Sequence, residues 1–149
     1  MIDEKKIPCV AGSSGLVGSY LVKNLSKLYP KVISISRREI KFSKNNVSNV
    51  IVDFDNLENE DILKEIDHLY IALGTTRKKA GSAKNFKKVD YHYCINLARI
   101  AYNFGVKRIS VVSSVGSNPN SNLLYPRTKG RLEKELSKLP FEHISIMKP

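Results

Sequence analysis

Two side chains that could move a proton lie four positions apart in the segment Tyr125-Pro126-Arg127-Thr128-Lys129. On a helix, residues with this spacing share a face, so the phenol of Tyr125 and the ammonium of Lys129 would lie close together. An ammonium stabilises a neighbouring phenolate and lets the tyrosine exchange a proton near neutral pH. The spacing therefore predicts a general acid or base, although an exposed helical pair without chemical importance has the same spacing.

A pair of hydroxyl groups precedes this segment. Ser113 and Ser114 follow directly on the apolar run Arg108–Val112, which predicts a strand. Proteins built on parallel sheets present their active residues at the carboxyl ends of the strands. A serine hydroxyl at such an end can hold the carbonyl oxygen of a substrate. We therefore expect these serines to act together with the tyrosine and the lysine.

A glycine-rich turn joins the first predicted strand to the first predicted helix: Ala11-Gly12-Ser13-Ser14-Gly15-Leu16-Val17-Gly18. Glycines let the backbone turn tightly and approach a pyrophosphate, and the helix N-terminus supplies free N–H donors and a positive dipole end. The last glycine permits close packing of the helix on the strand. The spacing Gly-x-x-Gly-x-x-Gly differs from the Gly-x-Gly-x-x-Gly fingerprint. Its place between strand and helix nevertheless favours a dinucleotide site over a turn without a ligand.

The end of the second predicted strand bears on the choice of dinucleotide. It reads Ser36-Arg37-Arg38, with Glu39 only afterwards. In dinucleotide-binding folds an acidic residue about 20 positions after the glycines binds the adenosine ribose, whereas an arginine there accommodates a 2′-phosphate. Because a guanidinium binds phosphate and a carboxylate repels it, the position favours NADP(H) over NAD(H). The alternative is that the arginines are simply solvated. Asp53, in the third predicted strand, could accept from the adenine amino group or could cap the following turn.

These motifs are separated by short apolar runs that alternate with longer amphipathic stretches. The predicted strands are Ile7–Ala11, Val32–Ser36, Val50–Phe54, His68–Leu73, Arg108–Val112 and His143–Met147. The predicted helices are Leu16–Leu28, Leu57–Ile66, Lys84–Phe104 and Tyr125–Leu139. Nearly continuous apolar strands between helices predict an α/β fold, a doubly wound parallel sheet of about six strands with helices on both faces.

The overall composition fits one soluble domain. The chain has 149 residues, of which 42% are hydrophobic, and we expect residues 1–149 to form a single domain. No stretch approaches the roughly 18–20 apolar residues that a membrane span needs. Cys9 and Cys94 lack metal-ligand neighbours and the histidines are scattered, so we expect core thiols and no metal site. A reducing cytoplasm is the expected compartment.

The formal net charge of +11 favours anionic partners, among them nucleic acid and the phosphates of a dinucleotide. Part of this charge forms a basic cluster after the fourth predicted strand, made of Arg77, Lys78, Lys79, Lys84, Lys87 and Lys88. A solvated loop is the favoured interpretation, and attraction of NADPH or of an acidic partner are the alternatives. Because the chain has no nucleic-acid-binding motif and no interleaving of aromatic and basic residues, we expect neither a nucleic-acid nor a membrane partner.

Together, the glycine turn, Ser113-Ser114 and the Tyr125/Lys129 pair resemble the short-chain dehydrogenase/reductase superfamily of NAD(P)-binding Rossmann folds, in its atypical extended branch. A closer resemblance runs through three further segments, Leu73–Ser82, Val89–Tyr91 and Ser121–Tyr125. These segments are similar to the Tat-interacting-protein oxidoreductase-like family of NADPH-binding proteins. The resemblance extends over almost the whole chain.

The resemblance implies NADP(H)-dependent hydride transfer to or from a small carbonyl or alcohol substrate. Tyr125 would be the general acid or base, Lys129 would bind the nicotinamide ribose and tune Tyr125, and Ser114, ahead of Ser113, would polarise the carbonyl. The residues expected to bind the cofactor are Gly12, Ser13, Ser14, Gly15, Leu16, Val17, Gly18, Arg37, Arg38, Asp53, Leu73, Gly74, Thr75, Tyr125 and Lys129.

Two departures from the family pattern leave a second function open. Many members carry a catalytic asparagine in the helix after the fourth strand, where this chain has Val89-Asp90. Relatives also continue past a strand-proline junction such as Ile146–Pro149, and we expect this chain to lack their C-terminal substrate-binding segments. The alternative is therefore a non-catalytic NADP(H)-binding regulatory or scaffold protein. Neither the substrate nor homodimer formation can be predicted from these residues.

Overall fold

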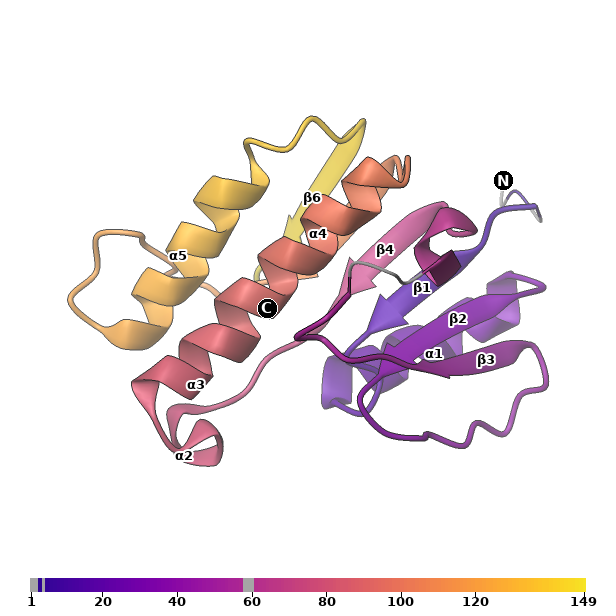
Figure 1. Ribbon diagram of the computed structural model, residues 1–149, viewed down its shortest axis with the longest axis horizontal. Helices are drawn as coiled ribbons and strands as arrows, with labels where there is room; N and C mark the ends of the chain where they lie inside the picture. Colours follow the sequence, from indigo (N-terminus) through magenta and orange to yellow (C-terminus); the bar gives the residue numbers. More distant parts are fainter. Residues whose placement is uncertain (1–2, 4, 58–60) are drawn as a thin grey trace.

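The computed structural model describes residue 3, residues 5–57 and residues 61–149. Its centre is a six-stranded sheet in the order β3-β2-β1-β4-β5-β6 (Figure 1). The strands are β1 Pro8–Ala11, β2 Val32–Ser36, β3 Val47–Ile51, β4 His68–Ile71, β5 Arg108–Val112 and β6 His143–Met147. Every neighbouring pair of these strands is parallel. The predicted doubly wound parallel α/β fold is therefore confirmed.

Helices cover both faces of this sheet. They are α1 Leu16–Leu28, α2 Arg77–Ala80, α3 Ala83–Lys87, α4 Cys94–Asn103 and α5 Leu124–Leu136. In Figure 1, α4 and α5 lie over one face and α1 lies behind the other. Side chains alternate along β1, so Val10 packs with Val22 of α1, whereas Cys9 and Ala11 belong to the cluster that contains Leu97 of α4. No helix in the described ranges is both long enough and apolar enough to span a membrane.

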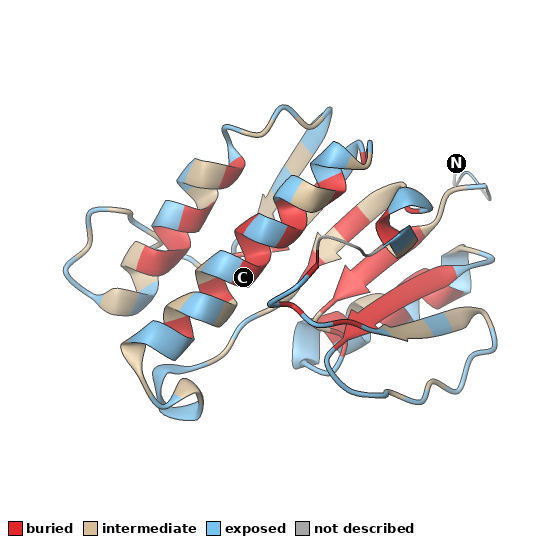
Figure 2. Cartoon of the chain, viewed as in Figure 1, coloured by how far each residue is buried: buried red, intermediate tan, exposed pale blue. Residues whose placement is uncertain are grey.

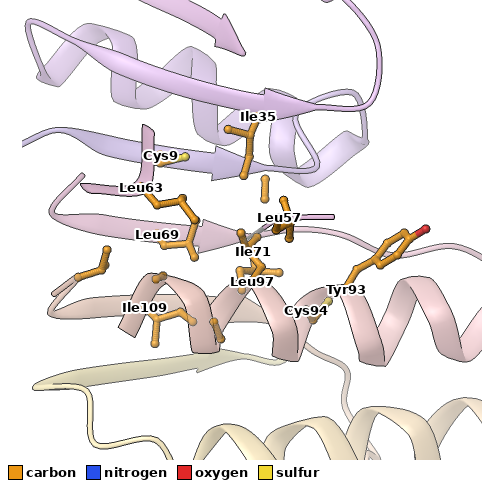
Figure 3. Close-up of a cluster of buried hydrophobic side chains, with 14 of the residues drawn as sticks. Cys9, Ile35, Leu57, Leu63, Leu69, Ile71, Tyr93, Cys94, Leu97 and Ile109 are labelled. Carbon is orange, nitrogen blue, oxygen red and sulfur yellow. The ribbon is translucent and has the colours of Figure 1, made fainter. Parts of the chain in front are cut away.

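The larger hydrophobic cluster fills the space between the sheet and the helices α4 and α5. Leu69 and Ile71 of β4 and Leu97 of α4 are at most 1% exposed, and they lie together in Figure 3. The burial colours in Figure 2 show the same layer as red faces turned inward. Both cysteines lie in this cluster as the sequence predicts, and burial raises the pKa of the Cys94 thiol to about 12. These thiols therefore serve packing.

Two predicted elements differ from the structure. The third strand is Val47–Ile51, three residues earlier than expected, because backbone pairing with β2 aligns Val47 with Val32 and Ile51 with Ser36. The apolar residues beyond it are buried for another reason: the Val52 amide still donates to the Ser36 carbonyl, and the chain then turns inward at Phe54. Of the predicted helix 57–66, residues 58–60 lie outside the described residues, and the rest contains only the 3-10 helix Asp61–Lys64.

The long helix predicted over Lys84–Phe104 is present but is not uniform. It consists of α3, the π-helical segment Lys88–Tyr93 and α4 in direct succession, and Gly105 ends it at a φ of +86°. A π-helical stretch carries one extra residue per turn, which changes the side chains that face the sheet. Short helix α2 occupies the first half of the basic cluster, which was predicted as a loop.

Helix α1 packs against the glycine turn at a point where only glycine fits. A Cβ atom on Gly18 would overlap the carbonyl oxygen of Gly12, and a Cβ on Gly12, whose φ is +92°, would overlap the carbonyl of Ala72. Gly15 is different, because its φ is −80° and its Cβ would lie at an ordinary 3.5 Å from the Gly12 oxygen. The close approach of α1 to the turn therefore depends on Gly18, and the close approach of the turn to the segment after β4 depends on Gly12.

Replacement of Gly18 by alanine tests this packing. Alanine normally favours a helix interior over glycine, but here the methyl group would push α1 off the turn, and we expect the free energy of unfolding to fall by about 1–3 kcal/mol. Urea unfolding without ligands gives this value. Gly15→Ala is the matched control, with an expected change within about 0.5 kcal/mol. Equal stability of the two variants would show that the contact is not tight.

Candidate cofactor and active site

The glycine turn is held in place by its own backbone and by Ser13. The Gly15 amide donates to the Gly12 carbonyl at 3.1 Å, and the buried Ser13 hydroxyl donates to the Val10 carbonyl at 3.1 Å. The Ser34 hydroxyl of β2 lies 2.6 Å from the Ser13 oxygen. Ser13 therefore shapes the turn from inside, and Ser14 is left exposed to solvent.

The start of α1 is electrostatically suited to an anion. The helix begins after Gly15 without a side-chain cap, and its first turn contains no acidic residue. The amides of such a turn and the positive end of the helix dipole are therefore free to act on a phosphate. Leu16 and Val17 are exposed there, with 77% and 42% of their surface accessible.

A cleft lies directly in front of this turn. Its lining residues are Gly12, Ser14, Gly15, Ser36, Arg37, Phe54, Ala72, Leu73, Gly74, Val89 and Tyr93. The strand order places it where the chain continues from β1 toward β2 on one side and from β4 toward β5 on the other, which is where open α/β sheets bind ligands. The lining includes Gly12, Gly15, Gly74 and Arg37. These features fit a dinucleotide phosphate.

Several residues expected from the sequence lie outside this lining. Asp53 is exposed and accepts the Asp55 amide at 2.9 Å, which is the capping role weighed above. Arg38 is exposed, and its backbone carbonyl accepts the Ser36 hydroxyl. The backbone amide of Thr75 donates a hydrogen bond to the Asp90 carboxylate.

Sequence reasoning missed other residues of the cleft wall, among them Phe54, Val89 and Tyr93. The rings of Phe54 and Tyr93 stack with centroids 5.6 Å apart. Tyr93 lies at a helical spacing within the predicted helix Lys84–Phe104, which is typical of a packed position. Nothing in the sequence indicated that it would contact Phe54.

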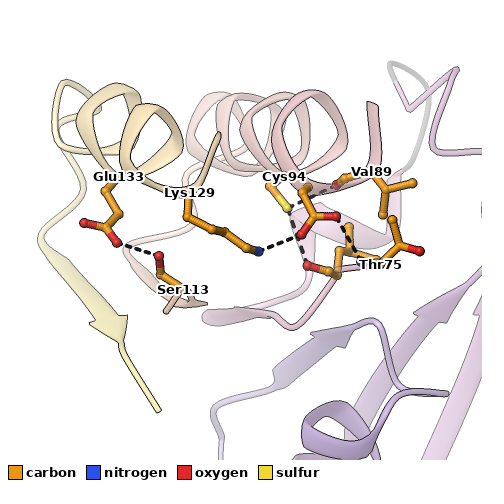
Figure 4. A network of polar contacts seen from close by, with 8 residues as sticks. Thr75, Val89, Cys94, Ser113, Lys129 and Glu133 are labelled. Carbon is orange, nitrogen blue, oxygen red and sulfur yellow. Dashed lines mark hydrogen bonds and ion pairs between the residues drawn. The ribbon is translucent and has the colours of Figure 1, made fainter. Parts of the chain in front are cut away.

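A buried ion pair lies directly behind the cleft residue Gly74. Lys129 Nζ lies 2.9 Å from Asp90 Oδ1, and the two side chains are 4% and 1% exposed. Asp90 Oδ2 accepts the Thr75 amide at 2.9 Å (Figure 4). Burial raises the pKa of Asp90 above its usual value, while the Lys129 ammonium and the Thr75 amide oppose the rise. Asp90 thus connects the segment after β4 to α5.

Tyr125 lies in the first turn of α5, at the entrance to this region. It is 45% exposed, and Lys129 Nζ is 5.8 Å from the centroid of its ring. The Phe86 ring packs against it at a centroid distance of 5.8 Å. The expected helical spacing therefore does bring the tyrosine and the lysine together, with Phe86 of α3 supporting the ring.

The two serines have different surroundings. Ser113 Oγ donates to Glu133 Oε1 at 2.5 Å (Figure 4), and Ser117 Oγ donates to the same oxygen. Lys148 pairs with the other oxygen of Glu133 at 3.1 Å. Burial alone would raise the pKa of Glu133, but these hydroxyls and the ammonium hold it below its usual value. Glu133 is four positions after Lys129, so the helical spacing could have placed it on the same face of the helix.

Ser114 is the serine whose hydroxyl is free. Its Oγ is buried and has no hydrogen-bond partner among the described residues. A buried polar atom without a partner is unfavourable, and such an atom often waits for a ligand or a water. Of the two serines, Ser114 is therefore the one available to a carbonyl oxygen.

The basic cluster lies outside the lining of this cleft. Lys88 of the basic cluster pairs with Asp55 at 2.9 Å, and the lining of the cleft contains no residue of this cluster. Within the described ranges, no group of three or more histidine, cysteine, aspartate or glutamate residues could hold a metal ion.

Replacing Lys129 by methionine tests the buried pair, because it leaves the Asp90 carboxylate without its counter-charge. We expect the free energy of unfolding at pH 8 to fall by about 3–5 kcal/mol. Loss of the ammonium raises the pKa of Asp90 further, so at lower pH the folded variant takes up a proton there. Its deficit relative to the parent chain should therefore shrink from pH 8 to pH 5.

Urea unfolding at the two pH values measures this deficit. The double variant Asp90→Asn, Lys129→Met is the control, and it should regain most of the stability because no buried charge remains. A deficit that is the same at pH 8 and pH 5 would mean that the carboxylate is not the cause.

Comparison with known proteins agrees with this geometry. Residues 9–142 match the model of the NAD dependent epimerase/dehydratase family. The chain is 37% identical over 147 residues to the mitochondrial protein FMP52 of Candida albicans, covering 94% of this chain and 64% of that protein. It is 35% identical over 152 residues to rat HTATIP2, covering 98% and 62%. The chain thus spans somewhat less than two thirds of the length of these relatives.

Solved structures show the same fold. A Lactococcus lactis protein described as the oxidoreductase ylbE superimposes with a TM-score of 0.80 at 24% identity, over 96% of this chain and 68% of that one. MoeE5 in complex with UDP-glucose and NAD gives a TM-score of 0.79 at 19% identity, over 95% and 53%.

The expectation of a cytoplasmic protein is contradicted by the curated relatives. FMP52 proteins of Candida albicans, Debaryomyces hansenii and Saccharomyces cerevisiae are all named mitochondrial. The free cysteines Cys9 and Cys94, on which the expected compartment rested, do not distinguish these compartments. The chain belongs to the NAD dependent epimerase/dehydratase family, within the extended short-chain dehydrogenase/reductase superfamily.

Proposed function

We propose that this protein binds NADP(H) and transfers a hydride to or from a carbonyl or alcohol. The observation that carries the proposal is the cleft itself: Arg37 belongs to its lining, and the buried Lys129 lies behind Gly74 of the same lining and close to the Tyr125 ring. A phosphate-binding group and an acid–base pair at one cleft are what such an enzyme needs.

The charge along the cleft supports NADP(H) over NAD(H). Among the described residues, the lining contains Arg37 and no aspartate or glutamate. Asp53, the acidic residue that could have faced the adenosine, is exposed and caps its own turn. A guanidinium without a competing carboxylate favours a 2′-phosphate.

The protein's own groups divide the acid–base work. The bound cofactor would supply or accept the hydride. Ser114, whose buried hydroxyl has no partner among the described residues, would hold the carbonyl oxygen. Tyr125 would donate or take the proton, and Lys129 would stabilise the phenolate form of that tyrosine. Ser113 would have a structural role because Glu133 occupies its hydroxyl.

The substrate class in this proposal is a small carbonyl or alcohol compound. Two exposed apolar side chains are next to the proposed catalytic residues in the chain: Val115 follows Ser114, and Leu123 is two positions before Tyr125. They favour a substrate with an apolar part. We also propose a mitochondrial location, on the strength of the names of the FMP52 relatives. Neither nucleic acid nor a membrane is needed as a partner.

Arg37→Ala tests the cofactor preference. We expect the dissociation constant for NADPH to rise at least tenfold, equivalent to about 1.4 kcal/mol, because one phosphate contact is lost. Affinity for NADH should change less than threefold. Isothermal titration of both cofactors measures this, with Arg38→Ala as the matched control, since Arg38 does not line the cleft. Equal losses for NADPH and NADH would place the 2′-phosphate elsewhere.

Tyr125→Phe tests the chemistry. The variant should bind NADPH as the parent does but should lose at least a hundredfold in kcat, because proton transfer by a positioned side chain contributes about 10²–10⁴-fold. Loss of NADPH absorbance with a panel of aromatic ketones and quinones is the assay. Tight NADPH binding by the parent without turnover of any substrate would instead favour the non-catalytic regulatory role.

A further inference from the structure

Asp90 occupies a place that the proposed reaction does not by itself require. It lies in the π-helical segment between α3 and α4, and it is 1% exposed. A Cβ atom on Gly74 would lie 3.4 Å from Asp90 Oδ1 and 4.0 Å from Lys129 Nζ. Because Gly74 lines the cleft, the ion pair is directly behind the cleft wall, and no side chain of residue 74 separates it from a ligand.

The strand order indicates which part of a dinucleotide would face this pair. Arg37 follows β2, on one side of β1, and Gly74 follows β4, on the other side. A dinucleotide lies across this switch point with its pyrophosphate at the N-terminus of α1. If the 2′-phosphate is at Arg37, as proposed above, then the nicotinamide half is at Gly74, next to Lys129 and Asp90.

The two redox forms of the cofactor differ in charge at this half. The oxidised nicotinamide ring carries a positive charge that the reduced ring lacks. An isolated Lys129 ammonium would therefore disfavour the oxidised form. Among the described residues the ion-pair partner of Lys129 is Asp90 alone. The nearby thiol of Cys94 stays neutral because burial raises its pKa to about 12, and Tyr125, 5.8 Å from Lys129 Nζ, carries no negative charge in its phenol form.

We propose that Asp90 is a positioning residue that cancels the charge of Lys129 behind the nicotinamide half and thereby sets the protein's relative affinity for NADP+ and NADPH. The carboxylate keeps the lysine in place through the 2.9 Å contact and is itself fixed by the Thr75 amide. The same balance would serve an enzyme that works in either direction and a protein that senses the cofactor's redox state. This inference rests on the proposed NADP(H) site.

Asp90→Asn is the direct test, because asparagine can still accept the Thr75 amide but carries no charge. Calorimetric titration of the parent and the variant at pH 7.5 gives dissociation constants for NADP+ and for NADPH. We expect the ratio of the NADP+ constant to the NADPH constant to rise by at least about fivefold in the variant, because the unpaired Lys129 ammonium repels the charged oxidised ring and not the neutral reduced ring. If Asp90 had a purely structural role, the substitution would weaken the binding of NADP+ and of NADPH by the same factor.

Three further variants make the result specific. Glu65→Gln removes the same charge from an exposed pair with Lys31, which lies at the amino ends of the strands, away from the cleft. The NADP+/NADPH ratio of this variant should equal that of the parent. Asp90→Asn combined with Lys129→Met should also return the parent ratio, since no charge remains behind the wall. Asp90→Ser provides the same test if the asparagine variant does not fold, which thermal unfolding reveals.

An unchanged ratio in folded Asp90 variants, or equal losses for both forms, would overturn the inference while leaving the NADP(H) site intact. Failure of the parent chain to bind either form would refute the proposed function, and this inference with it.

Discussion

The ion pair between Asp90 and Lys129 is the contact on which the candidate site depends. Moving two charges out of water is unfavourable unless they are paired and their remaining hydrogen-bonding groups are satisfied. The Thr75 amide supplies that further bond. One carboxylate therefore ties together three segments that are distant in sequence, namely the turn after β4, the π-helical segment and α5 (Figure 4). Because of this link, the cofactor wall and the helix that carries Tyr125 cannot move independently.

A second carboxylate, Glu133, gives the two neighbouring serines different roles. It accepts the hydroxyls of Ser113 and Ser117 and pairs with Lys148 after β6. The loop that follows β5 is therefore held at both of its ends. Ser114 lies between Ser113 and Ser117, and its buried Oγ has no partner among the described residues. Glu133 thus binds one of the two neighbouring serine hydroxyls and not the other, which is how two identical side chains become chemically distinct.

Much of the fold could be predicted from the sequence, because the spacing of apolar residues is a property of the chain itself. The bounds of α1, β2, β5 and β6 agree with the predicted ranges. The third strand does not agree, because it is an edge strand whose limits are set by pairing with β2 and not by its own apolar residues. The apolar side chains of Val52 and Phe54 are buried because the chain turns into the core after the strand ends. The π-helical segment was equally invisible, since it preserves the general helical periodicity.

For the site, the types of group available could be identified from the residues alone: a glycine turn before a helix, arginines after the second strand, and a tyrosine four positions before a lysine. These signals are local, and local spacing is enough to fix them. The folded chain was needed to show that Arg37 and not Arg38 lines the cleft, that the hydroxyl of Ser114 and not that of Ser113 has no partner among the described residues, and that Asp90 is the partner of Lys129. Each of these depends on contacts between segments far apart in the chain, which local spacing does not determine.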